Sequence, residues 1–133
     1  MKRPNVSRVV LDASAVLVLL NREPGADRLT PEILRDAICS TVNLAEVLTK
    51  LISAGGNPVE AWEDTLSCVR EAIPFTEEQA QLSGGLVAQT RSLGLSLGDR
   101  ACLSLGILLK APIYTAAKSW KNLKLGVPLH VLR

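Results

Sequence analysis

Short apolar runs alternate with longer segments of helical character along this chain. Residues 8–11 are mostly β-branched and apolar and end at Asp12, which predicts a buried strand. Four more short apolar runs are predicted as strands, namely residues 37–40, 73–75, 112–115 and 129–132. The chain is therefore expected to form five short strands.

Segments with a helical pattern or a helix-capping residue separate these strands. The clearest helix is predicted at 42–54, where Ser40 or Thr41 serves as the cap and Gly55-Gly56 ends the helix. Its apolar residues recur at helical spacing: Val42, Ala45, Leu48, Leu51 and Ile52. We therefore expect an amphipathic helix directly after the second strand.

Three further helices are expected in the first half of the chain. Ser14 is expected to cap a helix that runs to residue 20 or 21. A short helix is expected within residues 27–35. Pro58 suits the first turn of another helix, which is expected to reach residue 71.

Two helices are expected in the second half. Thr76 is followed by Glu77 and Glu78, and acids favour a helix N-terminus, although glycines at 84, 85 and 94 weaken the continuity of this helix. Ser96 and Asp99 match the capping-box pattern and open a helix through about residue 109.

The alternation of short strands and helices predicts an α/β fold with a mostly parallel sheet covered on both faces. A length of 133 residues is enough for one core, and neither a linker nor a repeat divides the sequence. A single domain over residues 1–133 is therefore expected. Leu, Val, Ile and Ala must build its core, because the chain has only one Phe, one Tyr and two Trp.

Composition argues against several classes of protein and site. The three cysteines and the single His130 fit no zinc pattern, so we expect buried reduced thiols and read His130 as a strand residue rather than a catalyst. Phosphate-loop and dinucleotide motifs are absent from the sequence, so nothing supports a nucleotide cofactor. The longest apolar stretch is too short to span a bilayer, and Met1–Ser7 is too polar to open a signal peptide. A cytoplasmic protein without a membrane partner is expected.

The net charge of +2 hides an asymmetry along the chain. All thirteen acids lie in residues 1–99 with nine bases, a net charge of −4, whereas residues 100–133 carry six bases and no acid, a net charge of +6. Such a basic segment can bind phosphate backbones, but it can equally be an ordinary solvated surface. Charge alone leaves both interpretations open.

Three acids from separate segments form the candidate chemistry. Asp12 ends a predicted strand, where ligands bind in open α/β sheets, but it can also satisfy the amides of the next helix. Glu46 lies four residues before Lys50 and can form an ion pair with it, and Asp99 can act as a helix cap. Carboxylates gathered from distant segments are also how proteins hold Mg²⁺ or Mn²⁺.

Four short motifs follow one another in a fixed order. They are a strand followed by Asp-x-Ser at 9–14, Asn-x-x-Glu at 43–46, Leu-Gly-Asp-Arg-x-x-Leu at 97–103, and a strand followed by Thr-Ala-x-Lys-x-Trp at 113–120. Their order and spacing resemble the PIN-domain ribonucleases and are similar to the toxin half of VapBC toxin–antitoxin pairs. The resemblance covers essentially the whole chain.

The resemblance implies a three-layer α/β/α sandwich with a mostly parallel five-stranded sheet. It implies metal-dependent endonucleolytic cleavage of RNA, in which a bound Mg²⁺ or Mn²⁺ activates water. Carried over residue by residue, the catalytic and metal-binding acids are Asp12, Glu46 and Asp99. Ser14 and Thr115 are the implied hydroxyl neighbours of that site.

The resemblance also implies the partners of the chain. An RNA substrate is expected, and Arg100, Lys118 and Lys121 are the candidate contacts to its backbone. A cognate antitoxin protein is expected as well, with the chain in a homodimer or in a toxin–antitoxin hetero-oligomer.

One position departs from the family pattern, because Ala117 stands where an acid is usual. This change is an engineered inactivation, a natural weakening or loss of activity, or a loss for which another group substitutes, although no acid follows Asp99 to replace the carboxylate locally. The expected function is therefore an endoribonuclease toxin impaired at Ala117. The alternatives are a catalytically inactive PIN-like module that binds RNA or a protein, and an unrelated α/β protein whose acids only cap helices.

Overall fold

The computed structural model describes residues 7–133 and has a five-stranded sheet at its centre. The strand order is β3-β2-β1-β4-β5, and all four pairings are parallel. The strands are β1 Val9–Leu11, β2 Ala37–Ser40, β3 Glu71–Ile73, β4 Ile113–Thr115 and β5 Leu129–Val131. Five strands were predicted, and the α/β class is confirmed. Residues 1–6, which carry most of the prediction about the N-terminus, lie outside the described residues.

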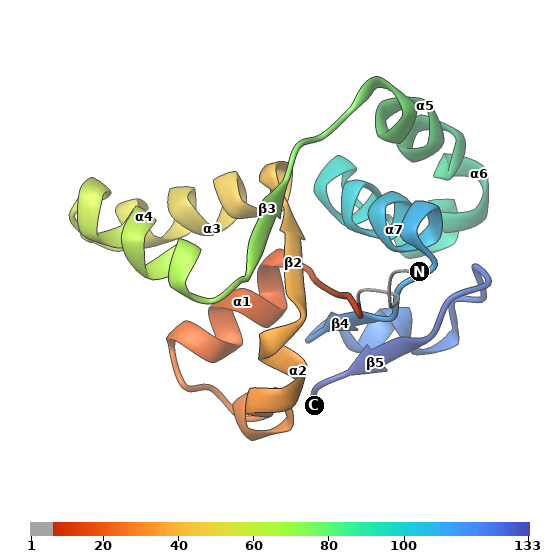
Figure 1. Cartoon of the computed structure of the whole chain (residues 1–133). Helices are drawn as coiled ribbons and strands as arrows, with labels where there is room; N and C mark the ends of the chain where they lie inside the picture. The colour runs from red at the N-terminus through yellow and green to blue at the C-terminus, as the bar shows by residue number, and fades with distance from the viewer. Residues whose placement is uncertain (1–6) are drawn as a thin grey trace, which may run out of the picture.

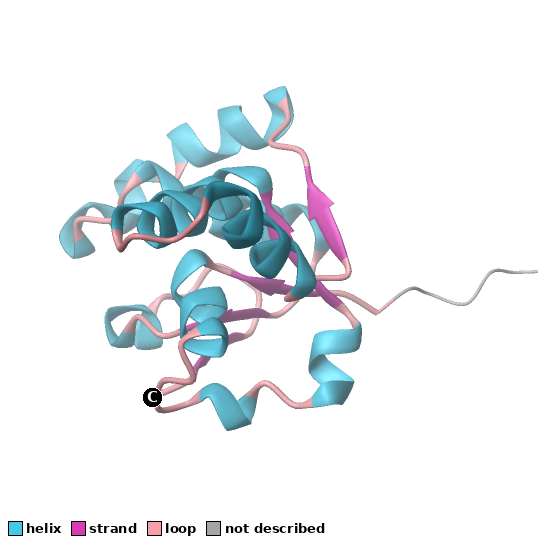
Figure 2. Ribbon diagram, turned by 90° about the vertical axis from the view of Figure 1, so that its left-hand side faces the viewer, coloured by secondary structure: helices cyan, strands magenta, loops and turns pink. Residues whose placement is uncertain are grey.

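Helices cover both faces of this sheet, which gives the expected three layers (Figure 2). The α-helices of the described chain are α1 Ala13–Leu20, α2 Pro31–Arg35, α3 Thr41–Ser53, α4 Pro58–Ser67, α5 Glu77–Gly85, α6 Val87–Thr90 and α7 Leu97–Leu109. Short 3₁₀ helices add η1 Ala26–Arg28, η2 Arg91–Leu93 and η3 Lys118–Asn122. In Figure 1, α3 and α4 lie together on one side of the sheet, and α5 and α7 lie together on the other.

Alternation along the strands divides the interior into two cores. Leu11 packs with Val16 and Leu44 under α1 and α3. Its neighbour Val10 points to the opposite face and packs with Leu103 and Ile113 under α7. Successive side chains of a strand point to opposite faces of the sheet, so a three-residue strand such as β1 serves both cores.

Local capping signals explain most of the helix starts. The predicted capping box is confirmed, because the Asp99 amide donates to Ser96 Oγ at 3.1 Å and the Ser96 amide donates to Asp99 Oδ2 at 2.9 Å. Ser40 rather than Thr41 caps α3, since its Oγ accepts from the Val42 amide. Pro58 stands in the first turn of α4, as predicted.

The predicted start of the first helix is wrong. Asp12 caps α1, because its carboxylate accepts from the Ala15 amide at 2.8 Å. Ser14 instead lies inside the helix, and its hydroxyl bonds to the Asp12 carboxylate and the Ala116 amide. The helix therefore starts directly at the end of β1, and a buried acid forms the junction.

Three other predicted boundaries also need correction. The segment 27–35 is divided, because η1 ends at Arg28 and Thr30 caps a separate α2. The helix from Pro58 ends at Ser67 instead of residue 71. The third strand is 71–73 instead of 73–75, because pairing with β2 selects that register. These boundaries depend on a neighbouring strand or on a cap that periodicity does not show.

Other expectations about composition can be checked within the described chain. Cys39, Cys68 and Cys102 are free and buried, and burial raises the pKa of the Cys68 thiol. His130 lies in β5, as predicted. Among residues 7–133, no helix is long and apolar enough to cross a bilayer.

Candidate active site

Asp12 is a buried carboxylate at the carboxyl end of β1, with only 3% of its surface exposed. Its Oδ1 accepts from Ser14 Oγ at 2.7 Å and from the Ala15 amide at 2.8 Å. Its Oδ2 accepts from Thr115 Oγ1 at 2.6 Å and from Ser14 Oγ at 2.9 Å. Both oxygens are thus held in place by groups from α1 and β4.

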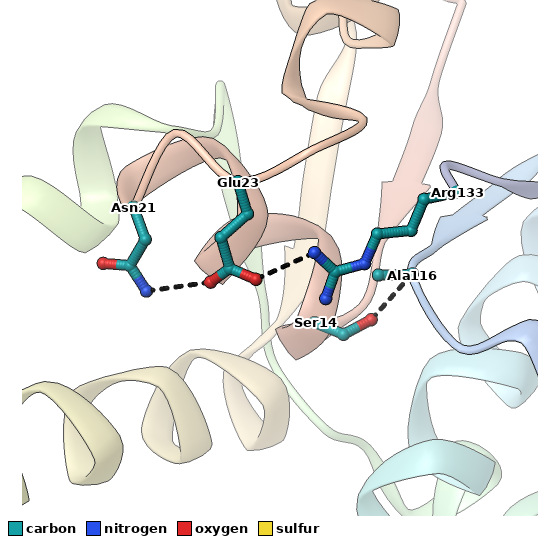
Figure 3. A network of polar contacts seen from close by, with 5 residues as sticks. All are labelled: Ser14, Asn21, Glu23, Ala116 and Arg133. Atoms are coloured by element: carbon teal, nitrogen blue, oxygen red, sulfur yellow. Dashed lines mark hydrogen bonds and ion pairs between the residues drawn. The ribbon is translucent and has the colours of Figure 1, made fainter.

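The two hydroxyls also fix the chain that follows β4. Ser14 Oγ accepts from the Ala116 amide at 2.9 Å (Figure 3). Thr115 Oγ1 accepts from the Ala117 amide at 3.0 Å. Each hydroxyl therefore donates to Asp12 and accepts from a backbone amide, which ties the turn at 116–117 to the carboxylate. Ser14 and Thr115, the two hydroxyl residues named from the sequence, thus contact Asp12 directly.

Burial raises the pKa of the Asp12 carboxyl from 3.8 to about 6. Hydrogen bonds from Thr115, Ala15 and Ser14 act against this rise, and the negative charge of Asp99 adds to it. A buried carboxylate with a raised pKa gains from a nearby cation, because the cation stabilises the ionised form. Such shifts are concentrated at functional sites, although structural networks also produce them.

Glu46 lies on α3 against the first turn of α7. Asn43 Nδ2 donates to Glu46 Oε1 at 2.8 Å and to the Gly98 carbonyl at 3.0 Å. A Cβ at position 98 would overlap the Glu46 carboxylate, so any larger residue there would require the flexible Glu46 side chain to shift from this position. The ion pair of Glu46 with Lys50 that sequence spacing offered is absent from the ion pairs of the described chain.

Asn43 is a candidate site residue that the sequence prediction missed. It is buried, and its Oδ1 is one of the buried side-chain atoms that lack a hydrogen-bond partner within residues 7–133. Unpartnered buried acceptors are uncommon, and they often serve a bound ion or water. The Asn-x-x-Glu spacing was the available signal, because residues three apart share a helix face.

All three predicted acids affect the same region of the second core. Burial raises the pKa of Cys102 on α7, and the negative charges of Asp12, Asp99 and Glu46 raise it further. Asp99 reaches this region from the first turn of α7, where its carboxylate also caps the helix. The capping explanation is confirmed for Asp12 and Asp99, and their role in a metal site stays a prediction.

The oxygen donors of this region suit a hard divalent cation, but the acidic side chains are widely separated. Oxygen atoms of carboxylates and amides are the ligands of Mg²⁺ and Mn²⁺. Across residues 7–133, however, no group of three His, Cys, Asp or Glu side chains is close enough to hold a metal ion. Mg²⁺ needs only one or two protein carboxylates and keeps several waters. The residues present therefore fit an ion held by fewer than three direct ligands.

The remaining predicted residues fall into two groups. Ala117 directly precedes η3, and Lys118 and Lys121 are exposed on that helix. Arg100 Nη1 donates to the Ser83 carbonyl at 2.9 Å, so part of its guanidinium joins α7 to α5. Contacts of these three cations with RNA stay predictions, and Arg100 is the one with a structural role already visible.

Comparisons with known proteins agree with this geometry. A family model described as PIN domain matches residues 9–124. A search of curated protein sequences finds no match.

Solved structures of similar fold include toxins and toxin–antitoxin complexes. Mycobacterium tuberculosis VapC20, described as a sarcin-ricin loop cleaving toxin, is 19% identical with a TM-score of 0.72, and 90% of this chain and 98% of that chain are covered. DNA-bound VapBC from Salmonella typhimurium is 11% identical with a TM-score of 0.76, and 96% and 99% are covered. VapBC2 from Rickettsia felis, bound to a promoter DNA fragment, is 17% identical with a TM-score of 0.70, and 91% and 96% are covered.

Proposed function

The chain belongs to the PIN-domain family, and on that premise we propose that it is an endoribonuclease toxin of a type II toxin–antitoxin system, weakened by Ala117. A divalent Mg²⁺ or Mn²⁺ would serve as its cofactor, and RNA as its substrate. The observation that carries the proposal is Asp12, a buried carboxylate with a raised pKa at the carboxyl end of a central strand.

Asp12, Asp99 and Glu46 are the residues proposed to hold the metal, directly or through its waters. When bound, such an ion supplies an activated water and stabilises charge on the scissile phosphate. Ser14 and Thr115 keep the Asp12 carboxylate in one orientation, so little reorganisation is needed when the ion arrives. The unpartnered Asn43 Oδ1 lies beside Glu46 and is a further candidate acceptor for a metal-bound water.

Ala117 is proposed to limit activity. It lies in the turn at 116–117 held by Ser14 and Thr115, and its amide donates to Thr115 Oγ1. A carboxylate there would add a negative charge next to Asp12, whereas the alanine methyl offers neither a ligand nor a water anchor. The loop is otherwise retained, because Trp120 is buried and anchors η3.

The experiment is RNA cleavage with Mg²⁺ or Mn²⁺ by this chain and by Ala117→Asp. Restoring the acid should raise cleavage by about 10–100-fold, as is usual for groups that support a metal. Ser119→Asp is the matched control, since it adds the same charge two residues away at an exposed position and should have little effect. Asp12→Asn in the Ala117→Asp background should abolish the gain.

Two results would count against the proposal. Metal binding by Ala117→Asp without cleavage of any RNA tested favours the inactive binding module, for which Ala117 and the basic residues 100–133 are the support. Cleavage that survives Asp12→Asn shows that the site assignment is wrong.

The proposed partner is an antitoxin protein. Support comes from the VapBC complexes among the similar structures, which contain both members of such a pair. Co-expression with a small open reading frame from directly beside this gene should yield a stable hetero-oligomer. Recovery of the chain alone, with its growth inhibition unrelieved, would argue against the toxin role.

A further inference from the structure

A cavity lies at the β5 edge of the sheet, apart from the three acids. It has a volume of about 720 Å³, which is within the range of ligand pockets. Segments distant in sequence form it, since η1, α2, β4, η3 and β5 all contribute. Its polar lining residues are Arg28, Tyr114, Lys118, Lys121, His130 and Arg133.

The cavity and the acid site lie on opposite faces of β4. Thr115 donates to Asp12, while its neighbour Tyr114 packs against the core under α1. Adjacent side chains of a strand point to opposite faces, so one step along β4 separates the two sites. Lys118, on the other side of the turn at 116–117, also lines the cavity. A flexible strand of ligand that crosses the end of β4 can therefore reach both.

One wall of the cavity is a pair of stacked aromatic rings. Tyr114 and His130 are partners in the β4–β5 register, and their ring centroids are 4.6 Å apart with an interplanar angle of 24°. Tyr114 is half-buried, whereas His130 is exposed. The pair thus presents a flat aromatic surface with a solvent-facing side.

The other walls carry positive charge that is only partly neutralised. Arg133 pairs with Glu23 at 3.0 Å (Figure 3). Arg28, Lys118 and Lys121 make no ion pair within the part of the chain that the structure describes. No acid is among the described residues that line the cavity.

We propose that this cavity binds a nucleotide of single-stranded RNA, with a base stacked on His130 and the backbone phosphates held by Arg28, Lys118 and Lys121. Stacking platforms beside basic side chains are how proteins hold unpaired nucleotides. An acidic peptide would use the cations but gain little from a flat aromatic surface, so the combination favours a nucleotide. The inference rests on the proposed function, because the nucleotide would belong to the RNA that the acid site cleaves.

Binding can be measured without cleavage, which separates this inference from the nuclease. A short fluorescein-labelled single-stranded RNA is titrated with the protein in EDTA, and anisotropy is followed. His130→Ala should weaken binding roughly tenfold, whereas His130→Phe, which keeps a stacking surface, should restore it. Lys121→Ala should lower the slope of log affinity against log salt by about 0.7. Lys50→Ala, at an exposed position on α3, is the charge control and should change neither.

Competitors decide between the possible occupants. Adenosine monophosphate should displace the RNA weakly. Binding of a poly-glutamate peptide should depend on Lys121 but not on His130. Equal affinity of the mononucleotide and the RNA would overturn the RNA assignment. So would a peptide that competes as well as RNA, or RNA binding that His130→Ala leaves unchanged in a variant whose thermal unfolding shows it to be folded.

The two proposals fail in different ways. If Ala117→Asp cleaves RNA and RNA binding does not depend on His130, the nuclease proposal stands and the proposal of a nucleotide in the cavity is wrong. If RNA binding depends on His130 and Ala117→Asp cleaves no RNA, the proposal of a nucleotide in the cavity stands and the nuclease proposal is wrong.

Discussion

The acid site and the cationic cavity use the two faces of one short strand in opposite ways. At Thr115 the side chain points to a buried carboxylate whose oxygens are all hydrogen-bonded. At Tyr114 it points to an open cavity with cations that have no ion-pair partner in the described chain. The first site is held by burial and hydrogen bonds, whereas the second depends on exposed charge.

This difference predicts how each site responds to its surroundings. Buried charge is weakly screened by salt but costs desolvation, so the acid site should depend on pH and weaken the fold at neutral pH. Exposed charge is screened and contributes little to folding, so the cavity should depend on salt. Three changes, from the largest expected effect to the smallest, test the contrast.

Trp120→Ala should disturb both sites at once. Trp120 is 1% exposed and anchors η3, which follows Ala117 and carries Lys118 and Lys121. Truncating a buried Trp costs about 3–5 kcal/mol. Urea unfolding measures the loss, with Trp62→Ala as the control, since Trp62 is 37% exposed and should cost clearly less. Equal losses would mean that η3 does not depend on this anchor.

Asp12→Asn should separate the acid site from the rest of the fold through its pH dependence. The folded pKa of Asp12 is raised from 3.8 to about 6, so its contribution to stability is fully present below pH 3.8 and is lost as pH rises through 6. A shift of this size corresponds to about 3 kcal/mol at most. The free energy of unfolding of the wild type, relative to Asp12→Asn, should therefore increase from pH 7.5 to pH 5.

Denaturant unfolding of both proteins at these two pH values checks the expectation. Subtracting the variant removes the contributions of the other acids, provided that Asn keeps the local geometry. A difference that stays constant with pH would show that Asp12 is not the carboxyl with the raised pKa. Added Mn²⁺ should stabilise the wild type more than the variant, since an ion that binds only the folded site raises stability by mass action.

Lys121→Ala should have the smallest effect on folding. The side chain is exposed and has no ion pair within residues 7–133, so the free energy of unfolding should change by less than about 0.5 kcal/mol. A thermal or urea unfolding curve tests this directly. A loss of 1 kcal/mol or more would mean that the cavity cations support the fold and that the contrast between the two sites is wrong.

The sequence determined the parts of this protein that local rules control. Five apolar runs and the caps between them were sufficient for the α/β class, because strand and helix periodicity are local properties. The Ser96–Asp99 capping box was predictable because both partners lie within one helical turn. Boundaries failed where a neighbouring strand decided them, as at β3, whose register follows from pairing with β2.

Only the tertiary structure decided how the sites are assembled. Ser14 and Asp12 are both good capping residues, and the choice between them depends on Thr115, 101 residues from Ser14, which binds Asp12. Asn43 is positioned by the carbonyl of Gly98, which lies on another helix, and a side chain at position 98 would displace the Glu46 carboxylate beside it. The sequence thus identified the candidate acids. Long-range packing determined which of their oxygens accept hydrogen bonds, how far burial raises the pKa of Asp12, and which cations lie around His130. These properties depend on neighbours that are distant in sequence, so no local sequence pattern predicts them.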